Sequence, residues 1–510
     1  MRGWISIGLV AMACGSHGNG GGGGGGDDDG SGGSGSGGGG ADASVPLATC
    51  TAINPVDVST PTSTVGNGTP GSCTAAALQT AATTGGTIVF SCGAAPVTIT
   101  VTTAITFANE TVLDGGGLVT LDGGGTTRIL YLNSNYNATT PRLTVQNLAF
   151  HAGMGPGSGD DTARGGGAIY RNGGSLTVID STFDDNHAGA TGQDLAGGAI
   201  YGFGGGETVI SGSTFTNNSA SDGGAVGSLN GNLTVVDSAF TGNAATGSGG
   251  NPGDGGCGGG LYMDGSMEAT SLCGVTIASN QAGAIGGGFF RVSNTHNGTF
   301  AMDRSTVDSN SITATTTGNA GGLYLEGLAI DITASTISNN QGAYNGGVWI
   351  DMNSANLTNV TIVGNTATAS NGGGVWFANS PTGTILNCTI ANNKATASGQ
   401  VGGAIFGTGL TVTNTIIANN TAQYDPSCEA PPLAGSSGNL QWTSGSLCTT
   451  APLVADPMLG ALGSNGGPTA TLLPASGSPA AGLGTSNCPT TDQRGNARST
   501  PCTAGAVELP

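Results

Sequence analysis

The sequence predicts an all-β chain that folds as a parallel β-helix, a solenoid in which every coil contributes three short strands. Three observations predict this fold. A phrase that ends in Asn recurs at intervals of about 25 to 37 residues, a Gly-Gly pair with apolar residues follows each copy, and a third phrase rich in Val, Ile and Thr completes the unit. The period is typical of solenoids, whose coils stack because one coil alone cannot bury its inward side chains.

The first phrase has the pattern F-x-x-N, as in STFTNNSA at 213–220, and later copies replace Phe by Ile or Val. We expect its apolar residue to point inward and to stack on its equivalents in neighbouring coils. We expect the Asn at a tight corner, because Asn tolerates a left-handed backbone and its side chain bonds nearby main-chain groups. Asn above Asn would form a structural amide ladder like that of cross-β stacks. The predicted ladder contains Asn186, Asn218, Asn243, Asn280, Asn310, Asn340, Asn365, Asn393 and Asn420.

The other two phrases are also strand-like. The second is represented by GGAIY at 197–201 and GGVWI at 346–350, and the third by LTVVDS at 233–238. Their lengths and β-branched residues are typical of strands, and the Gly pair permits positive φ and close approach between coils. Nine coils about 4.8 Å apart would form a rod on the order of 40 Å long. A helical pattern occurs at 73–82, and we expect this short helix to cover the first strand edge of the solenoid.

Composition divides the chain into five segments. Residues 1–14 are predicted to be a lipoprotein signal peptide, and 15–45 a flexible tether rich in Gly, Ser and Asp. Residues 46–108 would hold the N-terminal cap and the first strands, 109–422 the β-helix repeats, and 423–510 a C-terminal capping region with disulfides.

The signal segment carries Arg2 and an apolar run from Trp4 to Ala13 that is too short to span a bilayer. It ends at Cys14 and resembles a bacterial lipoprotein signal, in which the Cys becomes the lipidated first residue, although Ala11 stands where Leu is usual. The alternative is ordinary signal cleavage beside an incidental Cys. Lipidation of Cys14 predicts an exported lipoprotein at the outer membrane or cell surface of a Gram-negative bacterium, whose tether holds the folded body away from the membrane.

The charge balance excludes some classes of partner. The chain has 30 acidic and 10 basic residues, a net charge of −20. A nucleic-acid partner would need basic patches, and docking on anionic lipid would need a polybasic surface. Only 8% of the residues are charged, so the surface is expected to consist largely of Thr, Ser and Asn. Such a surface suits carbohydrate or another surface protein, and we expect the protein to be a monomer.

The cysteines predict disulfides, because ten of the 11 follow Cys14 in a chain that is expected to be exported. None is arranged as C-x-x-C, the spacing of zinc and thioredoxin motifs. Proximity in the sequence favours the following pairs, which leave Cys50 and Cys388 free: Cys428–Cys448, Cys488–Cys502, Cys73–Cys92 and Cys257–Cys273.

Two loops gather more acidic residues than the rest of the repeats. If Phe150 and Phe183 are equivalent inward residues, the loops 151–167 and 184–198 leave adjacent coils at the same corner. Two interpretations are open: the loops are solvated, or their hard oxygen ligands bind Ca²⁺, the one cofactor that the sequence suggests. Asp160, Asp161, Asp184, Asp185 and Asp194 are the candidate ligands, with His151, Arg164 and His187 nearby.

Two sets of motifs resemble known families. The pairs G-G-A-I and F-x-x-N are similar to the repeats of polymorphic outer membrane proteins, which are β-helical surface adhesins. DPMLG at 456–460, NGGPT at 465–469, GSPA at 477–480, DQRG at 492–495 and GAVE at 505–508 resemble the choice-of-anchor Q domain, although Ala481-Gly482 replaces the usual Ile-Asp after G-S-P-A. The resemblance implies a pectin-lyase-like, right-handed parallel β-helix at the cell surface. It implies no single activity, because this fold hosts both enzymes and inert rods.

Catalytic residues are scarce in the repeats. Glycoside hydrolysis needs two carboxyl groups across the scissile bond, and lyases of this fold need a basic residue beside Ca²⁺-binding carboxylates. Most long loops contain Gly, Ser, Thr and Ala, which do no acid–base work. The sequence therefore favours a non-catalytic, lipid-anchored surface protein that acts in adhesion or in carbohydrate or matrix binding. The alternative is an extracellular polysaccharide lyase or glycoside hydrolase.

Overall fold

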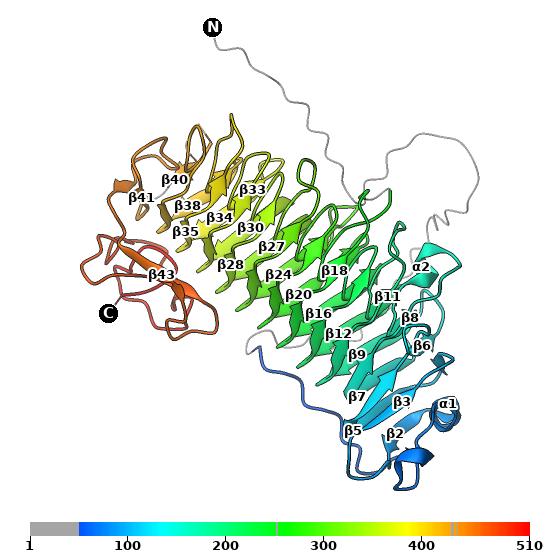
Figure 1. Ribbon diagram of the computed structural model, residues 1–510. Coiled ribbons are helices and arrows are strands. Elements are labelled where there is room, and N and C mark those ends of the chain that lie inside the picture. The colour runs from blue at the N-terminus through cyan, green and yellow to red at the C-terminus, as the bar shows by residue number, and fades with distance from the viewer. Residues whose placement is uncertain (1–49, 251–252, 430–432, 436, 510) are drawn as a thin grey trace, which may run out of the picture.

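The computed structural model describes residues 50–250, 253–429, 433–435 and 437–509. Cys14 and the tether at 15–45 lie outside the described residues. The described chain is a parallel β-helix with very little helix, which confirms the predicted fold class. Its coils stack from the N-terminal cap, blue in Figure 1, to the last coils, which are orange. Within the described ranges, no helix is long and apolar enough to cross a membrane.

The F-x-x-N phrases form the first row of parallel strands, here called the Phe row, with each strand in register with its neighbours. It begins with β3 (Val97–Thr100) and the second halves of β5 (Thr111–Asp122) and β7 (Arg142–His151). It continues through β10 (Thr182–Asp184), β13 (Thr214–Thr216), β17 (Ala239–Thr241), β21 (Thr276–Ala278), β25 (Thr306–Asp308), β28 (Thr336–Ser338), β31 (Thr361–Val363), β35 (Thr389–Ala391), β39 (Ile416–Ala418), β41 (Leu440–Trp442) and β42 (Leu453–Val454). Just after the Phe row, two-residue strands pair in a second sheet: β14 (Ser219–Ala220), β18 (Ala244–Ala245), β22 (Gln281–Ala282), β26 (Ser311–Ile312), β29 (Gln341–Gly342), β32 (Thr366–Ala367) and β36 (Lys394–Ala395).

The other two phrases form the Gly-Gly row and the third row. The Gly-Gly row contains β4 (Ile105–Phe107), β6 (Leu130–Asn133), β8 (Ile169–Asn172), β11 (Ile200–Phe203), β15 (Val226–Leu229), β19 (Leu261–Asp264), β23 (Phe289–Arg291), the first halves of β27 (Leu323–Thr333) and β30 (Val348–Thr358), β33 (Val375–Phe377) and β37 (Ile405–Phe406). The third row contains β1 (Ser63–Val65), β2 (Gly86–Phe90), the first halves of β5 and β7, β9 (Ser175–Ile179), β12 (Glu207–Ser211), β16 (Asn232–Val236), β20 (Thr270–Cys273), β24 (Thr299–Asp303), the second halves of β27 and β30, β34 (Thr382–Leu386), β38 (Thr411–Thr413) and β40 (Ala434–Gly435).

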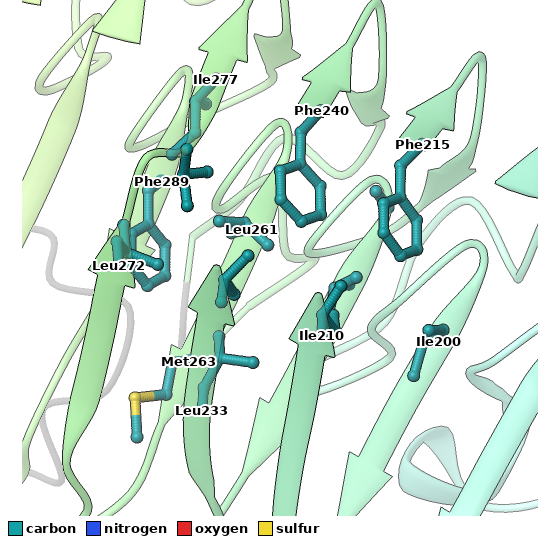
Figure 2. Packing of buried hydrophobic residues seen from close by; sticks show 14 of the residues in the cluster. Ile200, Ile210, Phe215, Leu233, Phe240, Leu261, Met263, Leu272, Ile277 and Phe289 are labelled. Carbon is teal, nitrogen blue, oxygen red and sulfur yellow. The ribbon is translucent and has the colours of Figure 1, made fainter. Parts of the chain in front are cut away.

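The core consists of inward side chains that stack on their equivalents. The rings of Phe150, Phe183, Phe215 and Phe240 lie 4.6–4.7 Å apart, nearly parallel and almost fully buried. Ile277 occupies the same position in the next coil, so that the stack continues with aliphatic side chains (Figure 2). Each inward residue is thus covered above and below, which an isolated coil could not provide.

The nine predicted asparagines are buried and form one continuous amide ladder. Each Nδ2 donates to the Oδ1 of the next Asn at 2.9–3.0 Å, from Asn186 to Asn420. One expected detail is wrong, because the left-handed residue is the one before each Asn, such as Asn217 (φ 57°) before Asn218. That residue makes the corner, so the Asn keeps its side chain inside, where every amide finds partners.

The N-terminal end is closed by α1 (Ala75–Thr84), close to the predicted helix at 73–82. Thr74 caps it by accepting a hydrogen bond from the Ala77 N–H at 3.2 Å, and Gly85, with φ 74°, ends it. The short 3-10 helix η1 (Pro70–Ser72) comes just before it. Leu78 is fully buried against the first coils.

A segment that we call the strap, residues 50–62, runs along the outside of the coils, blue in Figure 1. The disulfide Cys50–Cys273 fixes its start. The predictions that Cys50 is free and that Cys257 pairs with Cys273 are therefore wrong, because the strap brings Cys50 beside a coil 223 residues away in sequence. Sequence proximity could not show this contact.

The remaining cysteine predictions agree with the structure. The bridges Cys73–Cys92, Cys428–Cys448 and Cys488–Cys502 are present, and Cys388 is free and buried.

The C-terminal region, residues 456–509, packs on the side of the late coils rather than across their end (Figure 1). It contains an antiparallel pair, β43 (Leu459–Gly463) and β44 (Thr471–Pro474). Leu472 and Ala480 of this region join Val363 and Ala391 of the Phe row in one buried apolar cluster.

The motifs at 492–495 and 505–508 meet in this region. Asp492 Oδ2 accepts hydrogen bonds from the Arg494 guanidinium at 2.8–2.9 Å and from the Glu508 N–H at 2.9 Å. Gln493, between Asp492 and Arg494, contacts the outward side of the Phe row, where Thr361 Oγ1 donates to its Oε1 at 2.6 Å and its Nε2 donates to Thr336 Oγ1 at 2.9 Å. The D-Q-R-G motif therefore fastens the region to the coils.

Candidate functional site

The two acidic loops leave adjacent coils as predicted, because Phe150 and Phe183 are in register. The candidate Ca²⁺ ligands nevertheless find separate partners. Asp161 forms an ion pair with Arg164 at 2.9 Å within the one-turn helix α2 (Asp161–Arg164), for which Asp160 is the N-cap. Asp184 Oδ1 accepts hydrogen bonds from Thr216 and Asn217, which lie in the next coil.

The other two candidate aspartates diverge further. Asp185 contacts His187 at 2.9 Å, and Asp194 Oδ1 accepts from the Tyr262 hydroxyl at 2.7 Å. Among the described residues, the carboxylate, imidazole and thiol groups close enough to share a cation are those of Cys50, Cys273 and Asp303. Both of these sulfurs are tied in a disulfide, so they cannot act as thiolate ligands.

A feature that the sequence analysis missed is a row of aromatic rings on the outward side of the Gly-Gly row. The rings stack along the solenoid at centroid distances of 4.2–6.0 Å, except where Gly227 takes the aromatic position. A Cβ at Gly227 would lie 2.5 Å from the Cβ of Ala196, so only glycine fits there. The ring positions are Tyr131, Tyr170, Tyr201, Tyr262, Phe290, Tyr324, Trp349, Trp376 and Phe406.

Beside this break in the ring stack lies an acid–tyrosine cluster formed by Asp194, Tyr201, Asp222, Tyr262 and Asp264. The Tyr262 hydroxyl lies 2.7 Å from Asp194 Oδ1 and 3.1 Å from Asp264 Oδ2, and the Tyr201 hydroxyl donates to the Asp194 carbonyl at 2.8 Å. Asp222 Oδ1 accepts the Cys257 N–H at 2.8 Å, whereas its Oδ2 has no partner among the described residues.

Burial changes the acidity of this cluster. It raises the pKa of Asp264 to about 7, with the nearby Asp194 charge adding to the shift, and it raises the pKa of Asp222 well above its usual range. Proton-bearing carboxyl groups beside a tyrosine could serve acid–base chemistry. However, Asp222, Tyr262 and Asp264 are at most 3% exposed, so a polysaccharide could not reach them in this conformation.

Two arginines were also missed, because Arg at an inward strand position contradicts the apolar pattern. Arg171 and Arg291 are fully buried inside the solenoid. Arg171 donates to the Gly174 carbonyl at 3.0 Å, and Arg291 donates to the Glu268 carbonyl at 2.8 Å. They satisfy main-chain carbonyls at the turns between rows, a structural role that removes them from surface chemistry.

The outward side of the Phe row is exposed in the early coils. We call this surface the threonine face, and it comprises the outward residues of β10, β13, β17, β21 and β25. Thr182, Thr214, Thr241 and Thr276 are exposed there. Because the strands are in register and about 4.8 Å apart, the outward residues form two ranks, and hydroxyl groups occupy four of the five positions in the first rank and two of the five in the second. The remaining members are Asp184, Thr216, Ala239, Ala278, Thr306 and Asp308.

Beside the threonine face lies a corner groove of about 670 Å³. It follows the turns between the third row and the Phe row, from Cys50 at the start of the strap to the loop 491–495 of the C-terminal region. Its polar lining includes Asp237, Asp303 and Asn359.

No family model and no curated protein matches this chain. Among solved structures, it is similar to the A-module of the Azotobacter vinelandii mannuronan C-5 epimerase AlgE6, at 15% identity and a TM-score of 0.34, over 74% of this chain and 91% of that one. It is also similar to PfbA, a surface adhesin of Streptococcus pneumoniae, at 12% identity and a TM-score of 0.33, over 78% of this chain and 95% of that one. The similarity to the Dettilon tailspike protein has 14% identity and a TM-score of 0.27, and it covers 74% of this chain and 63% of that one. Similarities this distant carry no conclusion on activity.

Proposed function

We propose that this protein is a non-catalytic surface protein that binds carbohydrate through the threonine face. The observation that carries the proposal is the exposure of threonine hydroxyl groups on β10 to β21, in the row whose later strands are already covered by the C-terminal region. Hydroxyl groups both donate and accept hydrogen bonds, so a flat array of them matches the hydroxyl groups of a polysaccharide chain.

The chemistry of this face supports binding rather than turnover. Asp184 and Asp308 are its only ionisable members, and each is hydrogen-bonded to residues of the following coil. Asp184 and Asp308 belong to strands four coils apart, about 19 Å along the face, which is further than the carboxyl pair of a glycoside hydrolase. A ligand here would gain many weak contacts along a rigid surface, which is a suitable arrangement for adhesion.

Binding to insoluble polysaccharides, with purified protein in a pull-down, tests this function. Thr214→Lys and Thr276→Lys place long cations in the ranks, and we expect each to weaken binding about tenfold or more, on the scale of a lost interface contact of about 1.4 kcal/mol. The matched control is Thr234→Lys, which lies on the outward side of the third row. Equal loss in all three variants, or none in any, would reject the threonine face as the binding surface.

Anchoring is the second part of the proposal. Lipidation of Cys14 and the glycine-rich tether would hold the protein at the outer membrane or cell surface. Labelled fatty acid should be incorporated into the wild type and not into Cys14→Ser. Release of all the wild-type protein in soluble form would contradict the anchor without affecting the binding face.

A polysaccharide lyase or hydrolase is the alternative, and the acid–tyrosine cluster is the observation that favours it. For that chemistry, substrate would have to reach the buried Tyr262 and Asp264. Incubation with a panel of acidic polysaccharides, with Ca²⁺ or with EDTA, should give no new reducing or unsaturated ends. Product formation that Tyr262→Phe abolishes would replace our proposal with this one.

A further inference from the structure

The two ends of the solenoid are closed to different degrees. At the N-terminal end, α1 covers the first coils and Leu78 is fully buried. At the other end, the C-terminal region packs against the side of the late coils and not across their end (Figure 1). Among the described residues, the last strand of the stack, β42, pairs with β41 alone. The solenoid therefore ends in an open strand edge.

The main chain of β42 has hydrogen-bonding groups on its open side. The Leu453 N–H donates to the Asn439 carbonyl at 2.9 Å, and the Ala455 N–H donates to β41 at 3.2 Å. Successive residues of a strand direct these groups to opposite sides, so Val454 directs its N–H and its carbonyl away from β41. An edge of this kind is a template for pairing with another strand.

Val454 also occupies an inward position that nothing covers from above. It is in register with Gln441, Ile417 and Ile390 of the preceding coils, which are at most 2% exposed. Val454 itself is 42% exposed, because no further coil of the described chain stacks on it. Leu453, on the outward side of the same strand, is 41% exposed. One more layer of strand would bury both side chains.

The composition of this end differs from that of the whole chain. Residues 430–455 contain no Asp, Glu, Lys or Arg, although the chain has a net charge of −20. Five of the nine large hydrophobic residues that are exposed in the described chain lie within 424–458, so apolar surface gathers here, as it does at interaction sites. They are Tyr424, Leu447, Leu453, Val454 and Met458.

Charge and capping together indicate the partner. Two strongly acidic molecules repel each other over most of their surfaces, but two uncharged ends can approach. The N-terminal end cannot receive β42, because α1 closes it. We propose that the open end binds the open end of a second copy of this chain, with β42 of one copy antiparallel to β42 of the other. This inference departs from the monomer expected from the sequence, in which the open end is not visible.

A two-fold axis makes this contact self-complementary. Val454 of the two copies would lie opposite each other and exchange N–H···O bonds, as in a hydrogen-bonded pair of antiparallel strands. The inward side chain of each Val454 would then gain the cover that its own chain does not supply.

Pairing of the two edges would also join the two Phe rows into one sheet. A two-fold axis perpendicular to that sheet keeps both threonine faces on the same side. The dimer would present two binding faces to one surface, and attachment through both would exceed that through either one. Only this consequence rests on the proposed function, because the association itself requires no carbohydrate.

Sedimentation equilibrium on the full chain, without carbohydrate, tests the association. Every sample carries Cys14→Ser, so that no lipid contributes to the measured mass. We expect a concentration-dependent equilibrium between one copy and two. Val454→Lys places two like charges at the two-fold axis, and it should raise the dissociation constant about tenfold or more. The matched control is Leu118→Lys, because Leu118 is 39% exposed in the early coils, and this variant should associate like the wild type.

A mixture of oppositely charged variants separates loss of association from misfolding. Val454→Lys and Val454→Asp should each remain monomeric, whereas an equimolar mixture of the two should associate, because opposite charges then meet at the axis. The proposal would be overturned by a wild type that is monomeric at every concentration, by equal association of Val454→Lys and the wild type, or by a mixture that does not associate.

Disulfide trapping identifies the residues in contact. Hydrogen-bonded antiparallel pairs have Cα atoms about 5.5 Å apart, a distance that a disulfide can bridge. Val454→Cys should therefore give a covalent dimer on a non-reducing gel, and Leu118→Cys should not. A covalent product with a different protein and no dimer would assign the end to that partner and reject our proposal. Polysaccharide is absent from these measurements, so failure of the binding face would leave their results unchanged.

Discussion

The early and late coils share one architecture but differ on the outward side of the Phe row. In β10 to β25 this side is exposed or half-buried, whereas in β28 to β39 all of its outward residues are buried under the C-terminal region. The second outward position shows the change in chemistry, from Asp184 and Thr216 in the early coils to Val363 and Ala391 in the late ones.

Hydroxyl groups that become buried in the late coils all find partners. Thr336 Oγ1 donates to the Ala470 carbonyl at 2.5 Å, Thr361 Oγ1 donates to Gln493 at 2.6 Å, and Thr389 Oγ1 accepts the Ala506 N–H at 3.0 Å. Buried polar groups are costly unless they are bonded in this way. The inward side of the repeat therefore specifies the solenoid, while the outward side decides what each coil binds.

The inward side should be equally sensitive in both regions, and it gives the largest expected effect. Ile277→Asp and Ile390→Asp each put an unpaired carboxylate into the buried stack, which typically costs about 3–5 kcal/mol or more. Chemical denaturation should show severe destabilisation of both variants, or failure to fold. A normal unfolding midpoint for either one would mean that its inward placement is incorrect.

Outward substitutions should separate the two regions. Ala391→Asp buries a charge under the C-terminal region, and we expect it to destabilise that contact by about 3 kcal/mol and to expose 456–509 to limited proteolysis. The matched change in the early coils, Ala278→Asp, lies on the half-buried threonine face and should change stability by less than about 0.5 kcal/mol. Similar proteolysis of both variants would contradict the comparison.

The repeat made the fold predictable from the sequence. Each F-x-x-N copy identifies an inward residue and a ladder Asn. The periodicity alone was enough to place Phe183, Phe215 and Asn218 in their rows. The helix α1 was visible because its pattern stands out from a strand-forming background. Such local patterns are recognisable in the sequence because every coil repeats the same physical environment.

The sequence could not predict contacts that occur only once and are not repeated from coil to coil. Cys50 meets Cys273 only because the strap runs along the outside of the coils, and Gln493 meets Thr361 only because the C-terminal region folds back. The aspartates of the two loops have separate partners, and Asp194 accepts a hydrogen bond from Tyr262, which lies two coils further along the solenoid. Tyr262 belongs to the outward aromatic row, whose members are visible in the sequence as the aromatic residues of the Gly-Gly phrases.

The acid–tyrosine cluster gives the early coils a pH dependence of their own. The pKa of Asp264 in the folded state, about 7, is raised from an ordinary value of 3.8. The folded protein thus keeps a proton that the unfolded chain has lost, so stability from this group is full below about pH 4 and declines as pH rises toward 7. We expect amides of β19 to exchange faster at pH 8 than at pH 5, after correction for intrinsic rates.

Asp264→Asn supplies the control for that prediction. It removes the titrating group but keeps the size of the side chain, so the difference in melting temperature between pH 5 and pH 8 should shrink in the variant. An unchanged difference would assign the pH dependence to other groups.

Calcium gives the smallest expected effect. It tests whether the aspartates of the two acidic loops of the early coils can come together around an ion. A bound Ca²⁺ would stabilise the folded state by RT ln(1 + [L]/Kd), about 2.7 kcal/mol at a hundredfold excess over Kd. Binding would first have to draw Asp161 from Arg164 and Asp185 from His187, and the cost of breaking these contacts weakens any site. We therefore expect millimolar Ca²⁺ to raise the melting temperature only slightly. Asp160→Asn with Asp161→Asn should remove whatever rise occurs, and Mg²⁺ should produce less, because it demands a tighter octahedral geometry. A large rise that the double variant abolishes would show that the loops rearrange around the ion, and the early coils would then hold a metal site that the late coils do not.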